Sequence, residues 1–285
     1  MFKRKRTGAV LCPSCGKLVG VQDDTCYNCG RRNPGMWGFA PLLRSFRVAL
    51  AFENTVIWAC AALYLATLLV DPRHIVIAGG GLSFLAPSQY SLLVFGASGA
   101  YPIFGFGRWW TILSAGWLHA NLLHIVFNML WVRQIAPAAA ELYGASRAIM
   151  IYTISSAVGF SLSSMAGLVM GTSPIFFLRG AGITLGASAP IFGLFGALVL
   201  YGRRTGSSSL HSQAMTYAVI LFVFGFVMPG IDNWAHAGGF IGGYAAARFF
   251  DPLRPEREIH LVGAVVCLAL TALSVLASLL QGILF

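Results

Sequence analysis

Charged residues are scarce in this chain. Only 10% of its 285 residues are charged, 57% are hydrophobic, and the mean hydropathy is +0.75. A soluble core cannot use this much apolar surface, so a soluble globular protein is excluded and a polytopic membrane protein is predicted. Acidic residues are the rarer kind, since 19 Lys and Arg outnumber 9 Asp and Glu. Because the basic residues flank the hydrophobic runs, we interpret the net charge of +10 as a topology signal and expect no nucleic-acid partner.

Several chemical signatures are also missing. No predicted span holds an aspartate, and Asp232 falls in a loop, which argues against an aspartyl mechanism. The H-E-x-x-H motif is absent, which disfavours a catalytic zinc site at His119, His124 and His236. No line of charged groups runs through the spans, which disfavours a channel or transporter. At the start of the chain, Lys3 to Arg6 lead into a polar segment, so no secretory signal peptide is expected.

Cysteine is infrequent too, but four of the six cysteines are patterned. Cys12 and Cys15 form one C-x2-C pair, Cys26 and Cys29 form another, and a glycine follows each pair. Tight glycine turns let two such pairs face one tetrahedral Zn²⁺, so residues 1–36 are predicted to be a zinc ribbon that the metal stabilises. Two disulfides are the alternative, which a reducing cytosol disfavours. Four protein ligands leave no open position, so the zinc is expected to be structural and no cofactor is expected for catalysis.

Seven hydrophobic runs follow the ribbon and predict an all-α membrane bundle. They cover residues 48–70, 119–139, 149–170, 188–201, 213–228, 233–250 and 260–284. We therefore expect a basic and aromatic linker at 37–47, a six-helix membrane core at 48–250, and a cytosolic linker with a seventh helix at 251–285. The connection from 71 to 120 is too apolar for a solvated loop and too broken for a span, so it is expected to lie half-immersed.

The distribution of basic residues predicts the orientation in the membrane. With a cytosolic N-terminus, Arg73, Arg108 and Arg179 are the members of the 19 basic residues that fall on the outer side. This bias follows the positive-inside rule. The C-terminus and the outer ends of the second, fourth and sixth spans are then expected on the extracellular or periplasmic side.

A serine set between small residues stands at the start of the fourth run. It is Ser188, in the stretch from Leu185 to Gly193. Pro190 is tolerated in a first helical turn, so the helix is expected to begin near Ser188. The first N–H groups of a helix lack intrahelical acceptors and can face a developing negative charge, and Gly186 lets a substrate approach closely. Small residues also let membrane helices pack closely, so the stretch alone leaves a nucleophilic and a packing role open.

Polar residues on two other runs are expected beside this serine. His124 and Asn128 are four residues apart, so they share a helix face and can donate jointly to an oxyanion. His236 begins the sixth run at about the depth where Ser188 begins the fourth, and an imidazole titrates in the range needed to take the serine's proton. Small residues on the two runs are expected to pack closely and bring these ends together: Gly239 and Gly243 on the sixth, and Gly193, Gly196 and Ala197 on the fourth.

Three motifs together resemble the rhomboid family of intramembrane serine proteases over about residues 50–250. They are H-x4-H-x3-N at His119, His124 and Asn128, G-x-S at Gly186 and Ser188, and A-H-x2-G-x3-G at Ala235, His236, Gly239 and Gly243. The resemblance implies a dyad in which Ser188 attacks the peptide carbonyl and His236 is the general base. It also implies that His124, Asn128 and the Ser188 N–H bind the oxyanion, and that Phe192 lies beneath the histidine ring. The seventh span and the ribbon resemble features of particular members.

The resemblance implies hydrolysis of transmembrane proteins near the outer face of the lipid bilayer. We expect water to enter past a polar rim of His119, Asn121 and Asn233, with His119 also supporting its loop, and a cytosolic protein to bind the ribbon. The rival reading is a non-proteolytic relative that binds client membrane proteins, although a binder needs neither Ser188 nor His236.

The sequence departs from the family pattern at two positions, and one further residue is a candidate. Ala189 stands where glycine is usual, which is expected to narrow the oxyanion pocket. Thr111 follows Trp110 where arginine is usual, with Arg108 displaced by three residues, which is expected to weaken anchoring of the first loop. Asp232 precedes His236 by one turn and is a candidate to orient its ring.

Overall fold

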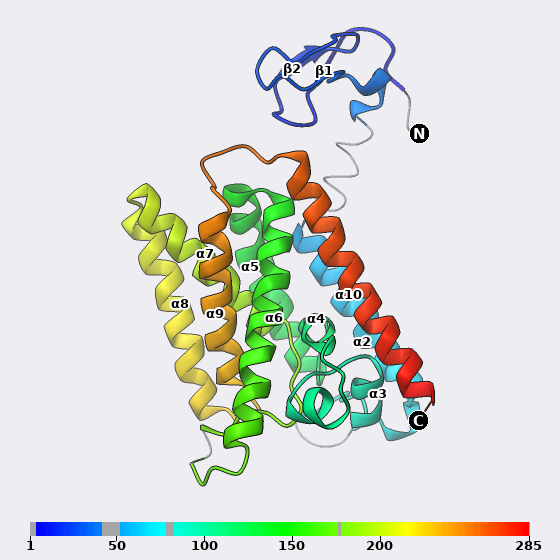
Figure 1. Ribbon diagram of the computed structural model, residues 1–285, viewed down its shortest axis with the longest axis vertical. Helices are drawn as coiled ribbons and strands as arrows, with labels where there is room; N and C mark the ends of the chain where they lie inside the picture. The colour runs from blue at the N-terminus through cyan, green and yellow to red at the C-terminus, as the bar shows by residue number, and fades with distance from the viewer. Residues whose placement is uncertain (1–3, 42–51, 78–82, 176–177, 285) are drawn as a thin grey trace.

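The computed structural model describes residues 4–41, 52–77, 83–175 and 178–284. A bundle of long helices forms most of this part of the chain, with a small β-containing unit at one end (Figure 1). The long helices are α2 (Phe52–Val70), α5 (Leu122–Tyr143), α6 (Ala145–Met170), α7 (Ser188–Thr205), α8 (Ser208–Val227), α9 (Asn233–Phe249) and α10 (Glu258–Leu284). The predicted all-α membrane bundle is therefore confirmed.

Five of the described helices are long and apolar enough to cross a membrane: α2, α5, α6, α8 and α10. The chain is thus an integral, multi-pass membrane protein. The other two long helices, α7 and α9, have 18 and 17 residues. A helix rises 1.5 Å per residue, so α7 is about 27 Å long and α9 about 26 Å, and both fall a little short of a hydrocarbon core of about 30 Å.

The predicted spans differ from the helices mainly at their ends. The first four predicted residues of α2 lie outside the described residues, and α5 starts at Leu122 because Asn121 caps it. The second predicted span, 119–139, lies three to four residues too early in the chain, since α5 continues to Tyr143. The fifth also begins earlier, at Ser208, because polar residues extend a helix beyond the hydrophobic run.

The centre of the bundle is α7, whose residues from Ala189 to Leu200 are all buried. Helix α9 packs against it without intervening side chains, as the small residues predicted. A Cβ added at Gly239 would collide with the carbonyl of Ala189, and one at Gly243 would collide with that of Gly193. Two helix axes approach this closely only where glycine faces backbone.

The connection between α2 and α5 contains short helical segments. These are a 3-10 turn (Pro72–His74), α3 (Gln89–Val94), a π-helical turn (Tyr101–Gly105), α4 (Thr111–Ser114) and a second 3-10 turn (Ala115–Trp117). Its inner side is buried at Leu92, Val94 and Leu118, while Tyr101, Phe106 and Trp109 are exposed. The connection therefore packs as a structured layer on one side of the bundle, where α3 and α4 are seen in Figure 1.

The N-terminal unit is an antiparallel pair of short strands, β1 (Ala9–Leu11) and β2 (Leu18–Gly20), with Val10 opposite Val19. Its apolar core is small and centres on Val10, Val19 and Val21 together with cysteines of the two C-x2-C pairs. A core of this size cannot hold a domain together without further cross-links or a metal.

Candidate active site

Ser188 is the first residue of α7, and the backbone before it has a conformation that requires glycine. Gly186 has φ of +133°, and its N–H donates to the carbonyl of Ala115 over 2.9 Å. A Cβ added at Gly186 would lie 2.7 Å from Nε2 of His124 and 3.7 Å from Oγ of Ser188. Gly186 is therefore required by both its dihedral angle and the imidazole beside it, and Nε2 of His124 faces the space next to Ser188.

The ring of His124 is fixed by the start of α5. The Asn121 side chain caps this helix by accepting from the N–H of His124 over 2.7 Å. The N–H of Ala120 donates to Nδ1 of His124 over 3.3 Å. Because Nδ1 accepts in this contact, the proton of a neutral ring is assigned to Nε2, which makes Nε2 a donor toward Ser188.

Asn128 lies one turn further along α5 and is buried. Its amide Nδ2 donates to the carbonyl of His124 over 2.8 Å. An amide nitrogen carries two hydrogens, so one of them stays available for a second acceptor. His124 and Asn128 thus present donors from the same face of α5.

The imidazole of His236 lies in the first turns of α9 and is 5% exposed. It stacks on Phe192 of α7 with the ring centroids 4.2 Å apart and an interplanar angle of 12°. Among the described residues, Nδ1 of His236 has no hydrogen-bond partner, and no hydrogen bond joins its ring to Ser188. Stacking, and not a hydrogen bond, therefore holds the ring in this state of the protein.

A cavity of about 840 Å³ opens where the N-terminal ends of α5, α7 and α9 meet. The candidate residues on its wall are Ser188, His236, His124, Asn128 and Phe192. Asn121 and Asn233 also line it, as the expected polar rim requires. His119 does not: its side chain is fully buried and packs edge-on against His124 with ring centroids 5.1 Å apart, so its expected place on the rim is wrong.

Asp232 does not orient His236. One carboxylate oxygen accepts from Ser163 over 2.5 Å and from Thr184 over 2.6 Å, and the other accepts from the N–H of Ala235 over 3.0 Å. The expected contact between Asp232 and the His236 ring is therefore wrong. The carboxylate caps the start of α9 and so points away from the imidazole, which lies one turn further along the helix. No sequence pattern predicts that Ser163 and Thr184 contact this carboxylate, since they lie 69 and 48 residues away from Asp232 along the chain.

Neither departure from the family pattern, at Ala189 or at Thr111, has the structural consequence expected of it. The Ala189 side chain is fully buried and packs toward Gly159 of α6, and Ala189 is absent from the cavity wall. The expected narrowing of the pocket is therefore wrong, because the methyl group points to the helix interface. In the first loop, the Arg108 guanidinium donates to the carbonyl of Leu93 over 3.1 Å and Thr111 donates to Ser98 over 3.2 Å. These contacts anchor the loop without an arginine at Thr111.

Comparison with known proteins decides the family. The family model of the Rhomboid domain matches residues 106–252, which is slightly more than half of the chain. Every residue that lines the cavity lies inside the match except Gln89 and Leu92. The chain belongs to the rhomboid family. Outside the matched region lie α2, α3 and α10.

Several curated rhomboid proteins are similar to this chain. "Rhomboid protease GluP" of Bacillus subtilis is 32% identical over 63% of this chain and 34% of its own length. "RHOMBOID-like protein 7" of Arabidopsis thaliana is 31% identical over 61% of this chain and 53% of its own length. "Rhomboid-like protease 3" of Toxoplasma gondii is 25% identical over 71% of both chains. The chain thus spans a third to a half of the length of the first two relatives.

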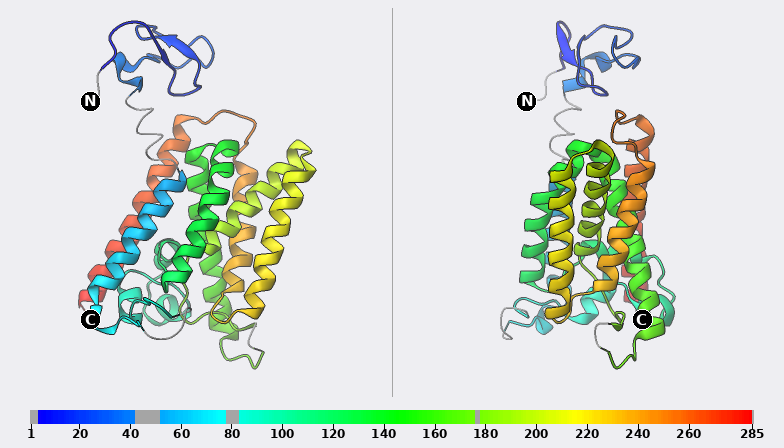
Figure 2. Two further views of the ribbon diagram at one scale, coloured as in Figure 1. Left: turned by 180° about the vertical axis from the view of Figure 1, so that it is seen from behind. Right: turned by 90° about the vertical axis from the view of Figure 1, so that its left-hand side faces the viewer.

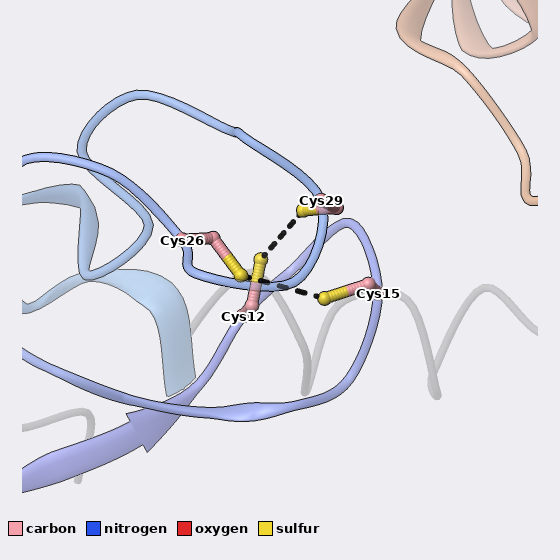
Figure 3. Close-up of side chains that lie close together, drawn as sticks. All are labelled: Cys12, Cys15, Cys26 and Cys29. Atoms are coloured by element: carbon pink, nitrogen blue, oxygen red, sulfur yellow. Dashed lines mark hydrogen bonds between the residues drawn. The ribbon is translucent and has the colours of Figure 1, made fainter.

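Outside the rhomboid domain, the four patterned cysteines converge on one point (Figure 3). Sγ of Cys12 lies 3.7 Å from that of Cys29, and Sγ of Cys15 lies 3.6 Å from that of Cys26. Zn–S bonds of 2.3 Å in a tetrahedron place two sulfurs about 3.8 Å apart, so the cluster fits such a metal. All four thiols are free, at separations too long for the predicted alternative of two disulfides.

The electrostatics of the cluster also favour a cation. Burial opposes ionisation of Cys15, but the Lys17 N–H and the neighbouring thiols lower the pKa of Cys15 to about 6. For Cys29, burial together with its thiol neighbours raises the pKa to about 12. Four thiolates this close together therefore require a bound cation, and the four-cysteine cluster can bind a metal.

Proposed function

We propose that this chain is an intramembrane serine endopeptidase that uses a dyad of Ser188 and His236. One observation carries the proposal: the serine that begins α7 and the imidazole stacked on Phe192 share a cavity wall with the donors of His124 and Asn128. A nucleophile, a base and oxyanion donors around one space are the components of acyl transfer. The named rhomboid proteases among the relatives support the same activity.

In the proposed reaction, Ser188 Oγ attacks the scissile carbonyl carbon while His236 takes the hydroxyl proton. The resulting oxyanion accepts hydrogen bonds from His124 Nε2–H, the free amide hydrogen of Asn128 and the N–H of Ser188. His236 then returns the proton to the leaving amine, and an acyl-enzyme forms on Ser188. Water, deprotonated by His236, hydrolyses that ester and restores both residues. Gly186, with its positive φ, leaves room for the carbonyl beside His124.

The substrates in this proposal are transmembrane proteins of the same bilayer, cleaved near its outer face. The N-terminal ends of α5, α7 and α9 lie opposite the β-containing unit (Figure 2), and the cavity lies at these ends. The positive-inside rule directs the basic N-terminal segment to the cytosol. A substrate helix must unwind locally there, because a helical carbonyl is hydrogen-bonded and shielded. The C-terminus lies on the outer side in this arrangement.

The remaining parts take supporting roles in the proposal. Residues 1–36 form a ribbon that holds structural Zn²⁺ through Cys12, Cys15, Cys26 and Cys29, and it binds a cytosolic protein. Residues 37–47 link it to the membrane core at 48–250, and 251–285 add a cytosolic linker and a seventh helix. His119 supports the histidine beside the oxyanion.

Cleavage in reconstituted membranes tests the function. The full chain is placed in liposomes with a panel of tagged single-span proteins, beside Ser188→Ala and His236→Ala variants. We expect new termini near the outer end of a substrate span with the wild type and none with either variant. Binding of the same proteins without any cleavage, at equal affinity in all three forms, would instead support the rival reading of a client-binding protein.

A further inference from the structure

Helix α10 lies on the side of the bundle away from α8 and α9 (Figures 1 and 2). It lies outside the matched rhomboid region, and it is long and apolar enough to serve simply as a membrane anchor. An anchor needs no buried polar side chains. Ser274 and Ser278 of α10 are nevertheless 3% and 0% exposed, and they lie one turn apart on the same face.

These two serines form hydrogen bonds with the short segment around α4. Ser274 donates to the carbonyl of Trp110 over 2.7 Å and lies 3.0 Å from the hydroxyl of Ser114. Ser278 accepts from the indole N–H of Trp110 over 3.0 Å. Both the backbone and the side chain of Trp110 are therefore held by α10, and Ser114 in turn donates to the carbonyl of Gly96 over 2.7 Å.

The same short segment also forms a hydrogen bond with the backbone just before Ser188. Ala115, the residue after Ser114, accepts the N–H of Gly186 over 2.9 Å. A second path runs through Ser98, which pairs with Thr184 by two backbone bonds of 2.7 and 2.9 Å. Apolar contacts also connect α10 to the segment before Ser188, because Val275 and Leu279 of α10 belong to the same hydrophobic cluster as Ile183 and Leu185.

We propose that Ser274 and Ser278 are positioning residues, which act through Trp110, Ser114 and Ala115 to fix the peptide plane at Gly186 and thereby the place of Ser188 and its oxyanion donors. This inference rests on the proposed function for its catalytic consequence, but its structural part stands alone. Displacing a reacting group by about 1 Å can lower a rate by about two orders of magnitude. Loss of these hydrogen bonds should therefore have a measurable effect on the reaction rate, although they lie far from Ser188.

The test compares Ser274→Ala, Ser278→Ala and Trp110→Phe in the full-length protein. Thr271→Ala is the matched control, because its buried hydroxyl donates within α10 to the carbonyl of Cys267 over 3.0 Å. We expect the rate of covalent labelling of Ser188 by a fluorophosphonate to fall about tenfold in Ser274→Ala and little in Thr271→Ala. With a cleaved substrate, kcat should fall and KM should stay, and Ser274→Thr should restore kcat.

Trp110→Phe and Ser278→Ala remove the same hydrogen bond from opposite ends. Their effects on the labelling rate should therefore be clearly less than additive in the double variant. Fully additive effects would overturn the assignment of that contact. Thermal unfolding of each variant identifies any rate change that comes from loss of fold.

Amide hydrogen exchange separates failure of this inference from failure of the proposed function. Even if the wild type is not labelled, exchange at residues 183–187 should be faster in Ser274→Ala and Ser278→Ala than in Thr271→Ala. Equal exchange in all three would overturn the inference, whether or not the protein is a protease.

Discussion

His236 lies flat on Phe192, with the ring centroids 4.2 Å apart and the planes 12° from parallel. The two residues come from α9 and α7, so the contact joins the helix of the proposed base to the helix of the proposed nucleophile. Since Nδ1 of His236 lacks a hydrogen-bond partner among the described residues, the phenyl ring determines where the imidazole lies.

Phe192→Leu should therefore impair the dyad without unfolding the bundle. Leucine keeps an apolar side chain at the position but removes the flat surface, and we expect the labelling rate of Ser188 to fall about tenfold. Phe195→Leu is the matched control, because Phe195 is also fully buried on α7 and has no ring contact with His236. Its ring instead contacts Trp131, Tyr217 and the edge of Phe192. Equal rates for the two variants would show that the stacking has no catalytic role.

Gly186→Ala should abolish activity for a local reason. The added Cβ meets the ring of His124 at a φ that L-residues rarely adopt, so both the donor and the backbone must move. We expect labelling to fall at least about 100-fold. Gly206→Ala carries a milder left-handed strain, at φ of +71°, with nothing within 4 Å of the new Cβ. The labelling rate of Gly206→Ala should match that of the wild type. If it fell as far as that of Gly186→Ala, backbone strain alone would explain both losses.

Gly243→Ala should destabilise the contact between α7 and α9. Its Cβ would collide with the carbonyl of Gly193, which cannot move independently of the helix, so overpacking should cost about 1–3 kcal/mol in unfolding free energy. Gly105→Ala has nothing within 4 Å of the new Cβ and should leave stability unchanged. Thermal unfolding in one detergent compares the two. A Gly243→Ala protein as stable as the control would contradict backbone-to-backbone packing.

Asp232→Ala should destabilise the contacts among α6, α9 and the segment before α7. The carboxylate joins Ser163 of α6, Thr184 in the segment before α7 and the first turn of α9, so its removal leaves two buried hydroxyls unpaired. We expect a loss of about 1–3 kcal/mol in stability together with slower labelling. Asp232→Asn keeps the cap and can donate to both hydroxyls, so it should behave almost as the wild type. A shifted pH profile in Asp232→Asn would instead reveal a direct charge effect on the histidine.

Removal of metal should affect the ribbon and spare the serine. We expect about one zinc ion per purified chain, since the four thiols offer a single tetrahedral site. Chelation or Cys26→Ser should lower the metal content and expose residues 4–41 to proteolysis, while labelling of Ser188 stays unchanged. Parallel loss of zinc and of labelling would contradict a purely structural ribbon. Acid should release the metal as well, because protons compete with it for the thiolates.

The sequence predicts the parts of the fold that depend on local pattern. Hydrophobic runs locate the long helices, glycine spacing locates the contact of α7 with α9, and the C-x2-C pairs locate the cysteine cluster. Four motif residues share a cavity wall because each lies near the N-terminal end of its helix: Ser188, His236, His124 and Asn128. The assignment of their roles remains a prediction.

Contacts between distant residues are what the sequence does not predict. Ala189 occupies a position next to the serine, yet its methyl group faces Gly159, because the helix rotation that sets its direction depends on tertiary packing. Asp232 precedes His236 by one turn, yet it caps α9 and binds Thr184. Ser274 and Ser278 resemble ordinary membrane-helix serines until Trp110 is found against them.

Labelling by a fluorophosphonate probe tests the central claim most directly, because only an activated serine forms the covalent bond. The purified full chain in liposomes should be labelled at Ser188, as read by mass spectrometry, and both Ser188→Ala and His236→Ala should stay unlabelled. A folded wild-type protein that takes up no label, or a His236→Ala variant labelled as fast as the wild type, would contradict the proposed dyad.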